Sequence, residues 1–536
     1  MNPAFIGATM ARRGLLRPGS PAALARQLGA LHTWGFGLAG ELRQAAARSP
    51  RQVAVADDTG ESLTYAELLD RSLRVAHALP AAPGDRVGIL CRNSAGMLAA
   101  LIGVTQLGAD PVLINTGLPA AQLAELTAAQ KLRLIIHDDE FSGVPPEVSL
   151  PMSALRLSDV TPAELRPPPR PSRTIVLTSG TTGTPKGARR PTPGGFGPLC
   201  SIIERIPLRR GTRVMIAAPL FHTWGFAALQ VALALRATVV VRRRFDPALI
   251  VDDLQKCDAL IAIPVMLQRI MELPEPGRRP PLDVVAVSGS ALPGGLANRF
   301  MDRFGDVLYN LYGSTEVSWA SIATPRDLRA APGTAGRPPY GTTVTVRDAA
   351  GGPVASGVSG RLFVHNDMLF EGYTAGEACG QSPDPVPRER YGHAHPQGRG
   401  WGRWPRLRKI NFRGLPTGDL GHIDDAGRVF VDGREDDMIV SGGENVFPSQ
   451  VENLLADLPE IREAAVVGVP DDEFGQRLAA FVVLHDGTNL DADRIREHVR
   501  QHRARFCVPR DVVFLDALPR TTTGKILTRL LVPPPE

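Results

Sequence analysis

Short apolar segments alternate with longer amphipathic stretches over much of the chain, and this alternation limits the fold more than any other feature. Each apolar segment has the length of a strand, and the stretches between them have helical spacing. The apolar segments are residues 86–90, 110–114, 133–137, 214–217, 238–241, 259–262 and 284–287. Because a parallel pair of strands needs a long crossover connection, this alternation predicts an α/β fold with mostly parallel sheets covered on both faces.

The chain of 536 residues is too long for one hydrophobic core, and its pattern changes twice. Residues 338–372 carry short strands between glycine-rich turns, which predicts a small β subdomain. After Gly433 the order helix, strand, strand, helix predicts a compact α+β domain of about 100 residues. We therefore expect a helical extension at 1–50, a large multi-subdomain part at 51–433 and a small C-terminal domain at 434–536.

A run rich in glycine, threonine and serine directly follows another apolar segment, residues 174–177. It reads Thr178-Ser-Gly-Thr-Thr-Gly-Thr-Pro-Lys-Gly187. Glycine reaches backbone angles closed to other residues, so successive N–H groups can point at one anion. The hydroxyl groups add donors, and Lys186 adds a positive charge. The run predicts a phosphate-binding loop, although not a Walker loop, because Lys186 is followed by Gly187.

The order of residues in this loop resembles the first signature of the adenylate-forming enzymes. That family includes acyl-CoA synthetases, the adenylation domains of peptide synthetases, and luciferases. Segments that resemble later signatures follow in the same order, at 219–226, 288–291, 312–316, 417–419, 433–448 and 519–525. The resemblance extends from about residue 50 to the end of the chain. Each short segment alone is weak evidence for the family, but several segments in the same order are strong evidence.

The resemblance implies a large ATP-binding and acyl-binding domain followed by a small mobile lid. It implies that Thr178, Ser179, Gly180, Thr181, Thr182, Gly183 and Lys186 bind the phosphates of ATP. It implies that the adenine side is formed by Ser288, Gly289, Ser290, Ala291 and Tyr312. Asp419 would accept the ribose hydroxyls, and Arg434 would hold ribose or phosphate. Gly442 and Gly443 would face the channel of the CoA thiol.

Adenylation brings a carboxylate against the α-phosphate of ATP, so the site needs cations and hydrogen-bond donors. The resemblance implies that Lys525 bridges the two anions in the transition state. Glu316 is the best candidate for a magnesium ligand, with Thr181, because Mg²⁺ takes few protein carboxylates and shares its other positions with phosphate and water. Thr315, beside it, can donate a hydrogen bond to the α-phosphate.

His222 has two interpretations in the second half-reaction, attack of the CoA thiol on the acyl adenylate. It could act as the base for the thiol, or it could form a gate or wall with Phe221, Trp224 and Phe226. We favour the wall, because a thiol with a pKa of about 8.5 needs no strong base. The resemblance places the hinge of the domain rotation, which would withdraw the catalytic lysine, at Asp436.

The composition and net charge limit the classes of partner that we expect the protein to bind. A net charge of +5, spread over 60 basic and 55 acidic residues, does not predict nucleic-acid binding, which needs a clustered basic face. It suits anionic substrates such as ATP, a carboxylate and CoA. The five scattered cysteines predict a reducing cytoplasm rather than disulfides or a zinc site. No apolar run reaches the roughly 20 residues that a membrane-spanning helix needs.

Two stretches leave alternatives open. Residues 22–47 predict one helix with a leucine-rich face, which either packs on the body of the protein or touches a membrane surface peripherally, at the inner face. Residues 375–412 form a Pro/Gly/Arg-rich insertion where the family usually has a short connection. That insertion is a passive loop, a local reading-frame error in a high-GC gene, or a functional insertion.

The residues and the resemblance together predict an ATP-dependent fatty-acid–CoA ligase, which forms acyl-AMP and pyrophosphate and then acyl-CoA and AMP. Its cofactors and co-substrates are ATP, Mg²⁺ and CoA, and its partner is a fatty acid or related carboxylate. Three alternatives stay open: an acyl-AMP ligase that passes the acyl group to a carrier protein, a peptide-synthetase-type enzyme, and a non-catalytic nucleotide-binding paralogue. The peptide-synthetase alternative is weakened because the region of His222 lacks an aspartate for an amino group.

Overall fold

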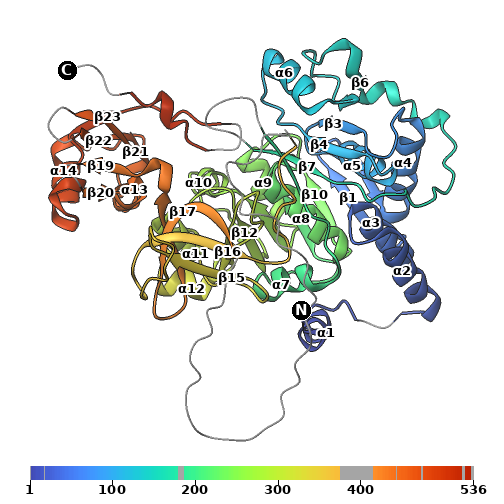
Figure 1. Ribbon diagram of the computed structural model, residues 1–536, viewed down its shortest axis with the longest axis horizontal. Coiled ribbons are helices and arrows are strands. Elements are labelled where there is room, and N and C mark those ends of the chain that lie inside the picture. The colour runs from blue at the N-terminus through green and yellow to red at the C-terminus, as the bar shows by residue number, and fades with distance from the viewer. Residues whose placement is uncertain are drawn as a thin grey trace, which may run out of the picture.

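The computed structural model describes residues 2–16, 19–178, 186–374, 414–441, 444–471, 475–521 and 525–532. In this part of the chain, three sheets form the large N-terminal part and a further sheet forms the C-terminal part. Figure 1 shows the C-terminal part in red, to the left of the larger part. The predicted fold class, an α/β chain with mostly parallel sheets and a small C-terminal domain that carries strands, is confirmed.

One six-stranded sheet leads into the predicted phosphate loop. Its order is β6-β5-β3-β4-β7-β8, and only β8 runs antiparallel to its neighbour. The strands are β3 Arg86–Leu90, β4 Asp110–Leu113, β5 Leu134–His137, β6 Ser149–Pro151, β7 Ile175–Thr178 and β8 Lys186–Arg189. The loop connects β7 to β8, so it begins at the carboxyl end of a parallel strand, the usual location of ligand sites in such sheets.

A second sheet of eight strands has the order β14-β13-β12-β11-β9-β10-β1-β2. Its central strands are parallel, and the outer strands β2 and β14 are antiparallel to their neighbours. The strands are β1 Val53–Asp57, β2 Ser62–Thr64, β9 Arg213–Ile216, β10 Thr238–Val241, β11 Ala259–Ala262, β12 Val284–Val287, β13 Leu308–Tyr312 and β14 Ser321–Ala323. One continuous core joins residues of both sheets.

Helices pack on both sheets, as the alternation predicts. The helices are α1 Pro3–Arg12, α2 Pro21–Trp34, α3 Leu38–Arg48, α4 Tyr65–Ala78, α5 Ala95–Gln106, α6 Ala120–Gln130, α7 Gly197–Arg205, α8 Thr223–Ala234, α9 Pro247–Leu254, α10 Pro264–Met271, α11 Gly294–Phe304 and α12 Pro325–Ala330. Helix α5 is buried along almost its whole length, because it carries no charged residue and contributes to the shared core. A capping box of Thr64 and Glu67 fixes the start of α4.

The single helix predicted over residues 22–47 is wrong, because the chain forms two helices there. Helix α2 ends at Gly35, whose φ of +73° lies in the region that favours glycine, and α3 begins at Leu38. The prediction missed the Gly35-Phe-Gly37 sequence as a helix stop. The break lets α3 enter the core while α2 packs against it from outside.

The predicted small β subdomain is a four-stranded antiparallel sheet in the order β15-β16-β17-β18. Its strands are β15 Thr343–Arg347, β16 Gly360–His365, β17 Leu415–Ile423 and β18 Val429–Arg434. The sheet is larger than predicted, because β17 and β18 follow the insertion and pair with strands that precede it. The insertion itself, at 375–412, lies outside the described residues.

The C-terminal part has its own sheet and its own core. Its elements are β19 Ile439–Ser441, β20 Glu444–Val446, α13 Pro448–Ala456, β21 Ile461–Asp471, β22 Gly475–Leu484, α14 Ala492–His502 and β23 Asp511–Phe514. It contacts the large part at α10, where the Gln268 side chain donates a hydrogen bond to the Arg462 carbonyl oxygen at 2.6 Å. Short 3₁₀ turns lie at Pro146–Val148, Met152–Leu155, Leu157–Asp159, Glu435–Asp437, Arg505–Cys507 and Thr528–Leu530.

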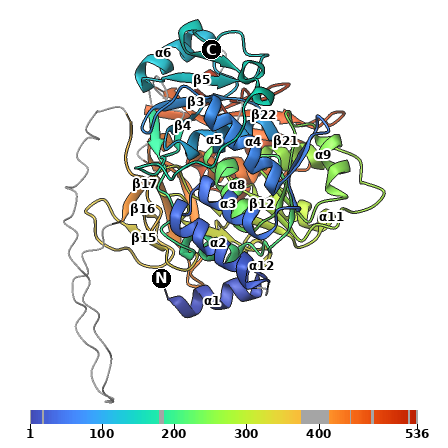
Figure 2. The ribbon, with the colours of Figure 1, turned by 90° about the vertical axis from the view of Figure 1, so that its right-hand side faces the viewer.

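None of the helices that the structure describes is both long and apolar enough to cross a membrane. The cysteines in the described ranges, Cys91, Cys200, Cys257 and Cys507, are free and buried. Figure 2 shows α1 at the lower edge of the large part and α2 above it, on the side that faces the viewer.

Candidate active site

A tight turn at the carboxyl end of β13 presents Thr315 and Glu316. The turn needs glycine at position 313, because a Cβ there would lie 2.3 Å from the carbonyl oxygen of Ser318. Ser318 itself has a positive φ of 63°. The Ala320 N–H then donates to the Tyr312 carbonyl oxygen at 2.8 Å and closes the turn. The sequence Tyr-Gly-Ser-Thr-Glu therefore forms the tight turn and also supplies its polar side chains.

The main chain of residues 370–374 brings Glu316 next to the strand that leaves the phosphate loop. The Tyr373 hydroxyl donates to Glu316 Oε1 at 2.8 Å, and the Phe370 N–H donates to the Glu316 carbonyl oxygen at 2.8 Å. Tyr373 also forms a β-bridge with Ala188 of β8. The Thr374 N–H donates to the carbonyl oxygen of Gly187 at 2.8 Å. The carboxylate and the end of the loop thus belong to one connected site.

Arg190, just after β8, supports Thr315 from a buried position, with 6% of its surface exposed. Its Nη1 donates to the Thr315 carbonyl oxygen at 2.7 Å. Burial lowers the pKa of Arg190 to about 10, and the charge of Glu316 acts in the opposite direction, so the guanidinium is still protonated at neutral pH. The sequence analysis missed Arg190 and Tyr373, because neither arginine nor tyrosine at these positions stands out without knowledge of the fold.

Asp419 and Tyr312 meet on the neighbouring edge of the site. The Tyr312 hydroxyl donates to Asp419 Oδ2 at 2.5 Å, and Arg434 Nη1 lies 3.5 Å from Asp419 Oδ1. Asp419 and Arg434 face each other as register partners on β17 and β18. Burial raises the pKa of Asp419, while the hydrogen bond from Tyr312 and the charge of Arg434 lower it. A carboxylate held in this way can accept hydrogen bonds from a diol.

The predicted adenine side lies at the same edge as Tyr312, since β12 and β13 are parallel neighbours. Ser288 follows β12 and is buried, whereas Ser290 and Ala291 are exposed. Gly289 has a φ of +97°, so the chain turns sharply there. Ser290 and Ala291 follow the end of β12 and are exposed, and their contact with adenine stays a prediction.

His222 is neutral at physiological pH, because burial lowers its pKa to about 4. It occupies the N-cap position of α8 without a side-chain capping hydrogen bond. Its ring lies 4.6 Å from that of Phe221, and its buried Nε2 has no hydrogen-bond partner among the described residues. At the next residue, the Thr223 hydroxyl lies 3.0 Å from the Thr315 hydroxyl. Trp224 donates its indole N–H to the Ala262 carbonyl oxygen at 3.0 Å. The role of His222, as a wall residue or as a base, stays a prediction.

Some predicted residues are not brought to this site by any described contact. Lys525 is exposed, and its N–H donates to the Thr521 hydroxyl at 3.1 Å. Asp436 is exposed in the 3₁₀ turn that follows β18. Thr178 and Lys186 differ from these two residues, because they pair with each other on β7 and β8, next to the Gly187 and Ala188 contacts described above. The remaining predicted residues lie outside the described ranges: Ser179, Gly180, Thr181, Thr182, Gly183, Gly442 and Gly443.

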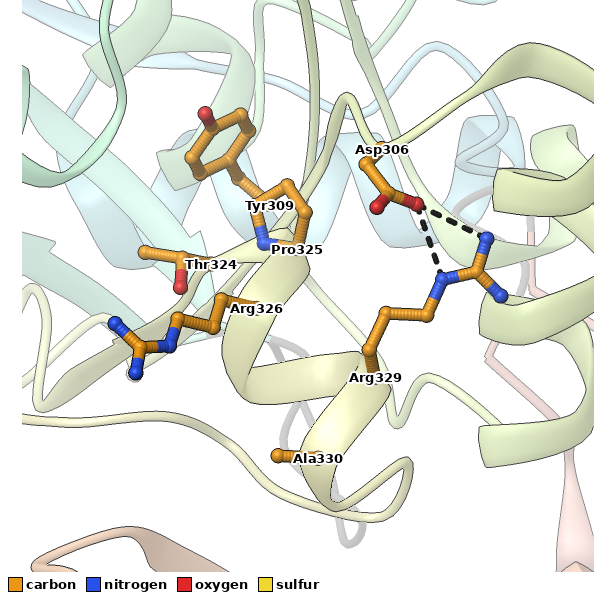
Figure 3. Close-up of a pocket in the computed structure, with 7 residues that line it drawn as sticks. All are labelled: Asp306, Tyr309, Thr324, Pro325, Arg326, Arg329 and Ala330. Carbon is orange, nitrogen blue, oxygen red and sulfur yellow. Dashed lines mark hydrogen bonds and ion pairs between the residues drawn. The ribbon is translucent and has the colours of Figure 1, made fainter.

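A surface hollow of about 720 Å³ lies elsewhere, around α12 and the beginning of β13. Figure 3 shows Tyr309, Arg326 and Arg329 on its sides, with Arg329 paired to Asp306. Tyr309 precedes Tyr312 by three residues, which is about 10 Å along a strand. The hollow therefore lies toward the opposite edge of the sheet from Glu316, and its residues take no part in the site.

Two family assignments agree with this geometry. Residues 42–374 match the AMP-binding enzyme family, and residues 450–525 match the AMP-binding enzyme C-terminal domain. The chain belongs to the AMP-binding enzyme family, the adenylate-forming enzymes, as its sequence predicted. Its relatives include acid–thiol ligases that form CoA esters.

Two of these relatives cover nearly the whole chain. A feruloyl-CoA synthase of Amycolatopsis sp is 32% identical over an alignment 500 residues long, which covers 89% of this chain and 95% of that protein. The long-chain-fatty-acid–CoA ligase FadD13 of Mycobacterium tuberculosis (strain ATCC 25618 / H37Rv) is 28% identical over an alignment of 517 residues. This alignment covers 91% of this chain and 97% of that protein. The solved structure of o-succinylbenzoate coenzyme A synthetase (MenE) from Bacillus subtilis with ATP and magnesium ion has a TM-score of 0.76. At 24% sequence identity, the match covers 91% of this chain and 98% of that one. The similarity supports the fold described above.

The described residues fit Mg²⁺ only as a metal shared with a nucleotide. They contain no group of three or more His, Cys, Asp or Glu side chains able to hold a metal ion alone. Glu316 offers one carboxylate beside the end of the phosphate loop. Mg²⁺ is commonly bound by one or two carboxylates together with phosphate oxygens and water, so this donor set is suitable.

Proposed function

We propose that the protein is an ATP-dependent fatty-acid–CoA ligase, which forms acyl-AMP and pyrophosphate and then acyl-CoA and AMP. One observation carries the proposal: the turn with Thr315 and Glu316 is joined through Tyr373 to β8, the strand that leaves the phosphate loop. A triphosphate held by that loop would lie beside one hydroxyl and one carboxylate. This is the donor set that phosphoryl chemistry with magnesium requires.

We assign the first half-reaction to this side of the site. An oxygen of the substrate carboxylate attacks the α-phosphorus, a new P–O bond forms, and pyrophosphate leaves with the electrons of the broken bond. Thr315 donates to the α-phosphate, and Lys525 on the C-terminal part supplies the cation between the two anions. Glu316 and Thr181 would hold Mg²⁺, which neutralises charge on the phosphates when it is bound.

We assign the nucleoside to the neighbouring edge. Asp419 would accept the ribose hydroxyls, with Arg434 beside it, and Ser288, Gly289, Ser290, Ala291 and Tyr312 would face the adenine. The support is the pair of contacts from Tyr312 and Arg434, which fix the orientation of the Asp419 carboxylate. The loop with Ser179, Gly180, Thr181, Thr182, Gly183, Thr178 and Lys186 would take the phosphates.

In the second half-reaction, the CoA sulfur attacks the acyl carbonyl carbon and AMP leaves. We propose that residues 434–536 rotate about Asp436 between the two steps, so that Gly442 and Gly443 replace Lys525 at the site. The large part would span 51–433 and the helical extension 1–50. Asp436 is exposed next to Glu435, whose carboxylate pairs with Arg361 at 2.6 Å, so the turn is anchored on one side.

The fatty acid is proposed because apolar side chains follow His222, and each buried CH₂ of an acyl chain contributes about 0.8 kcal/mol. An aromatic acid is a second candidate, since the feruloyl-CoA synthase is a relative at 32% identity. We propose a cytoplasmic location, which the free cysteines support.

The experiment is ATP–pyrophosphate exchange with a panel of fatty acids, ferulate and indoleacetate, followed by thioester formation with CoA. We expect exchange and acyl-CoA with a fatty acid. Exchange only with the aromatic acids would replace the fatty acid by the second candidate. Exchange without acyl-CoA would favour a carrier-protein acceptor, and no exchange with any acid would contradict the proposed function.

A further inference from the structure

Helix α2 turns an apolar face to the outside of the protein. Leu24 and Leu28, one helical turn apart, are 46% and 52% exposed, and Leu16, before the helix, is 54% exposed. The outward side also carries Pro21 and Ala25, both exposed. Figure 1 shows α2 at the outer edge of the large part, with α3 beside it.

The opposite side of α2 packs on the large part. The outward leucines therefore take no part in this packing. The Gln27 side chain donates a hydrogen bond to Gln44 Oε1 of α3 at 2.8 Å. The Arg43 guanidinium lies 3.8 Å from the ring centre of Trp34. Leu31 is 4% exposed. These contacts fix the helix on α3 and determine which side faces outward.

The N-terminal segment that carries this face has a single sign of charge in its own sequence. Residues 2–40 contain arginine but no aspartate or glutamate, and the first acidic residue of the chain is Glu41. Arg12 and Arg26 are exposed. Glu41 itself is buried, and burial raises its pKa to about 8, so it adds little negative charge at neutral pH. Helices with an apolar face and flanking arginines bind the interface of anionic lipid bilayers.

We propose that the outward face of α2, with Leu24 and Leu28, docks the enzyme on an anionic membrane surface. A second copy of the chain fits this face less well. The helix is 14 residues long, about 21 Å, whereas a stable dimer buries roughly 800 Å² per partner. A membrane needs only a few inserted apolar side chains with cationic neighbours. The inference does not depend on which acid the enzyme activates.

The test is co-sedimentation of the full chain with two kinds of phosphatidylcholine vesicle, one that contains the anionic lipid phosphatidylglycerol and one that lacks it. We expect binding to the anionic vesicles and much weaker binding to the neutral ones. Because the Debye length shrinks from about 10 Å at 0.1 M salt to about 3 Å at 1 M, binding should fall with salt.

The double variant Leu24→Asp/Leu28→Asp should weaken vesicle binding about tenfold or more, since it removes both inserted side chains. The matched control is Leu249→Asp, which changes a leucine of α9 with 45% exposure and should leave binding unchanged. Arg26→Glu keeps the leucines and should weaken binding to anionic vesicles alone. It serves as the second variant if the double variant does not fold.

Three outcomes would overturn the proposal. The first is no binding of the native chain to anionic vesicles. The second is an equal loss of binding in Leu249→Asp, which would show that the face is not specific. The third is a dimer in sedimentation velocity that the double variant abolishes while vesicle binding is absent, which would assign the face to a second copy of the chain.

Discussion

Arg190 donates a hydrogen bond to the carbonyl oxygen of Thr315 at 2.7 Å, and thereby holds the turn that presents Glu316. The charge is buried near a carboxylate, and the Thr315 hydroxyl on the other side contacts Thr223 at 3.0 Å. Two contacts therefore hold the turn: the Arg190 guanidinium binds its main chain, and Thr223 at the start of α8 binds the Thr315 hydroxyl. Its geometry therefore depends in part on Arg190, which lies outside the segments that resemble family signatures.

Arg190→Met should lower the rate of adenylation about 100-fold, because it removes a charge-assisted hydrogen bond worth about 1.5–3 kcal/mol and leaves the Thr315 carbonyl unpaired. ATP–pyrophosphate exchange measures this rate, and Arg190→Lys should recover part of it. The control is Arg205→Met, whose guanidinium donates to the Ile322 carbonyl oxygen at 2.8 Å on the edge strand β14. That variant should lower the melting temperature with little effect on kcat. Equal losses of kcat in both variants would assign Arg190 a purely structural role.

Tyr373→Phe should raise the Mg²⁺ concentration needed for half-maximal exchange several-fold, since Glu316 loses the hydroxyl that orients its carboxylate. The measurement is a Mg²⁺ titration at fixed ATP. Tyr340→Phe is a suitable control, because that ring stacks on Phe5 at 3.9 Å, at the packing of the N-terminal helix. An unchanged titration in Tyr373→Phe would argue against Glu316 as the magnesium ligand.

Asp419→Asn should stabilise the protein near pH 7 while it weakens AMP binding. Burial raises the pKa of Asp419 in the folded state, so folded protein binds this proton more tightly than unfolded protein does. Stability is therefore lost as pH rises from the ordinary aspartate value through the raised one, and the neutral amide avoids this loss. Melting curves and AMP titrations between about pH 4 and 8 give both quantities. AMP affinity of the native chain should fall on acidification, and a pH-independent affinity would remove Asp419 from the ribose site.

Lys525→Ala should abolish adenylation and spare thioester formation from supplied acyl-AMP. The cation is needed only where the carboxylate meets the phosphate. Separate assays of the two half-reactions check this split, and Lys256→Ala, another exposed lysine, should leave both unchanged. If both half-reactions fell equally in Lys525→Ala, the lysine would have a structural role instead.

Asp436→Pro should have the opposite effect, with adenylate formed and thioester lost. Proline fixes φ near −65° and restricts the backbone change that a hinge makes. The C-terminal part would then stay in one orientation, and acyl-AMP should accumulate in a quenched single-turnover assay. Normal acyl-CoA formation in this variant would place the hinge elsewhere.

The strand pattern predicted the parallel sheets well because buried strands are short, apolar runs that need no partner to be recognised. The extra strands β17 and β18 of the antiparallel sheet were not predicted, since pairing across the insertion is a long-range property. The break at Gly35 was missed because leucine spacing continues on both sides of it. In the site, Tyr312 and Asp419 were named from their signatures and do meet, whereas their hydrogen bond, Arg190 and Tyr373 depend on tertiary contacts that no local pattern contains.

The two ends of the stretch 375–413 are held by different sheets. Before it, the Thr374 N–H donates to Gly187; after it, Leu415 pairs with Val364 on β16. The separation of Glu316 and Asp419 is therefore set by strand pairing on either side and not by the number of residues between. We therefore expect that a change of chain length within this segment, by insertion, gene splitting or circular permutation, leaves the two halves of the proposed nucleotide site in place relative to each other.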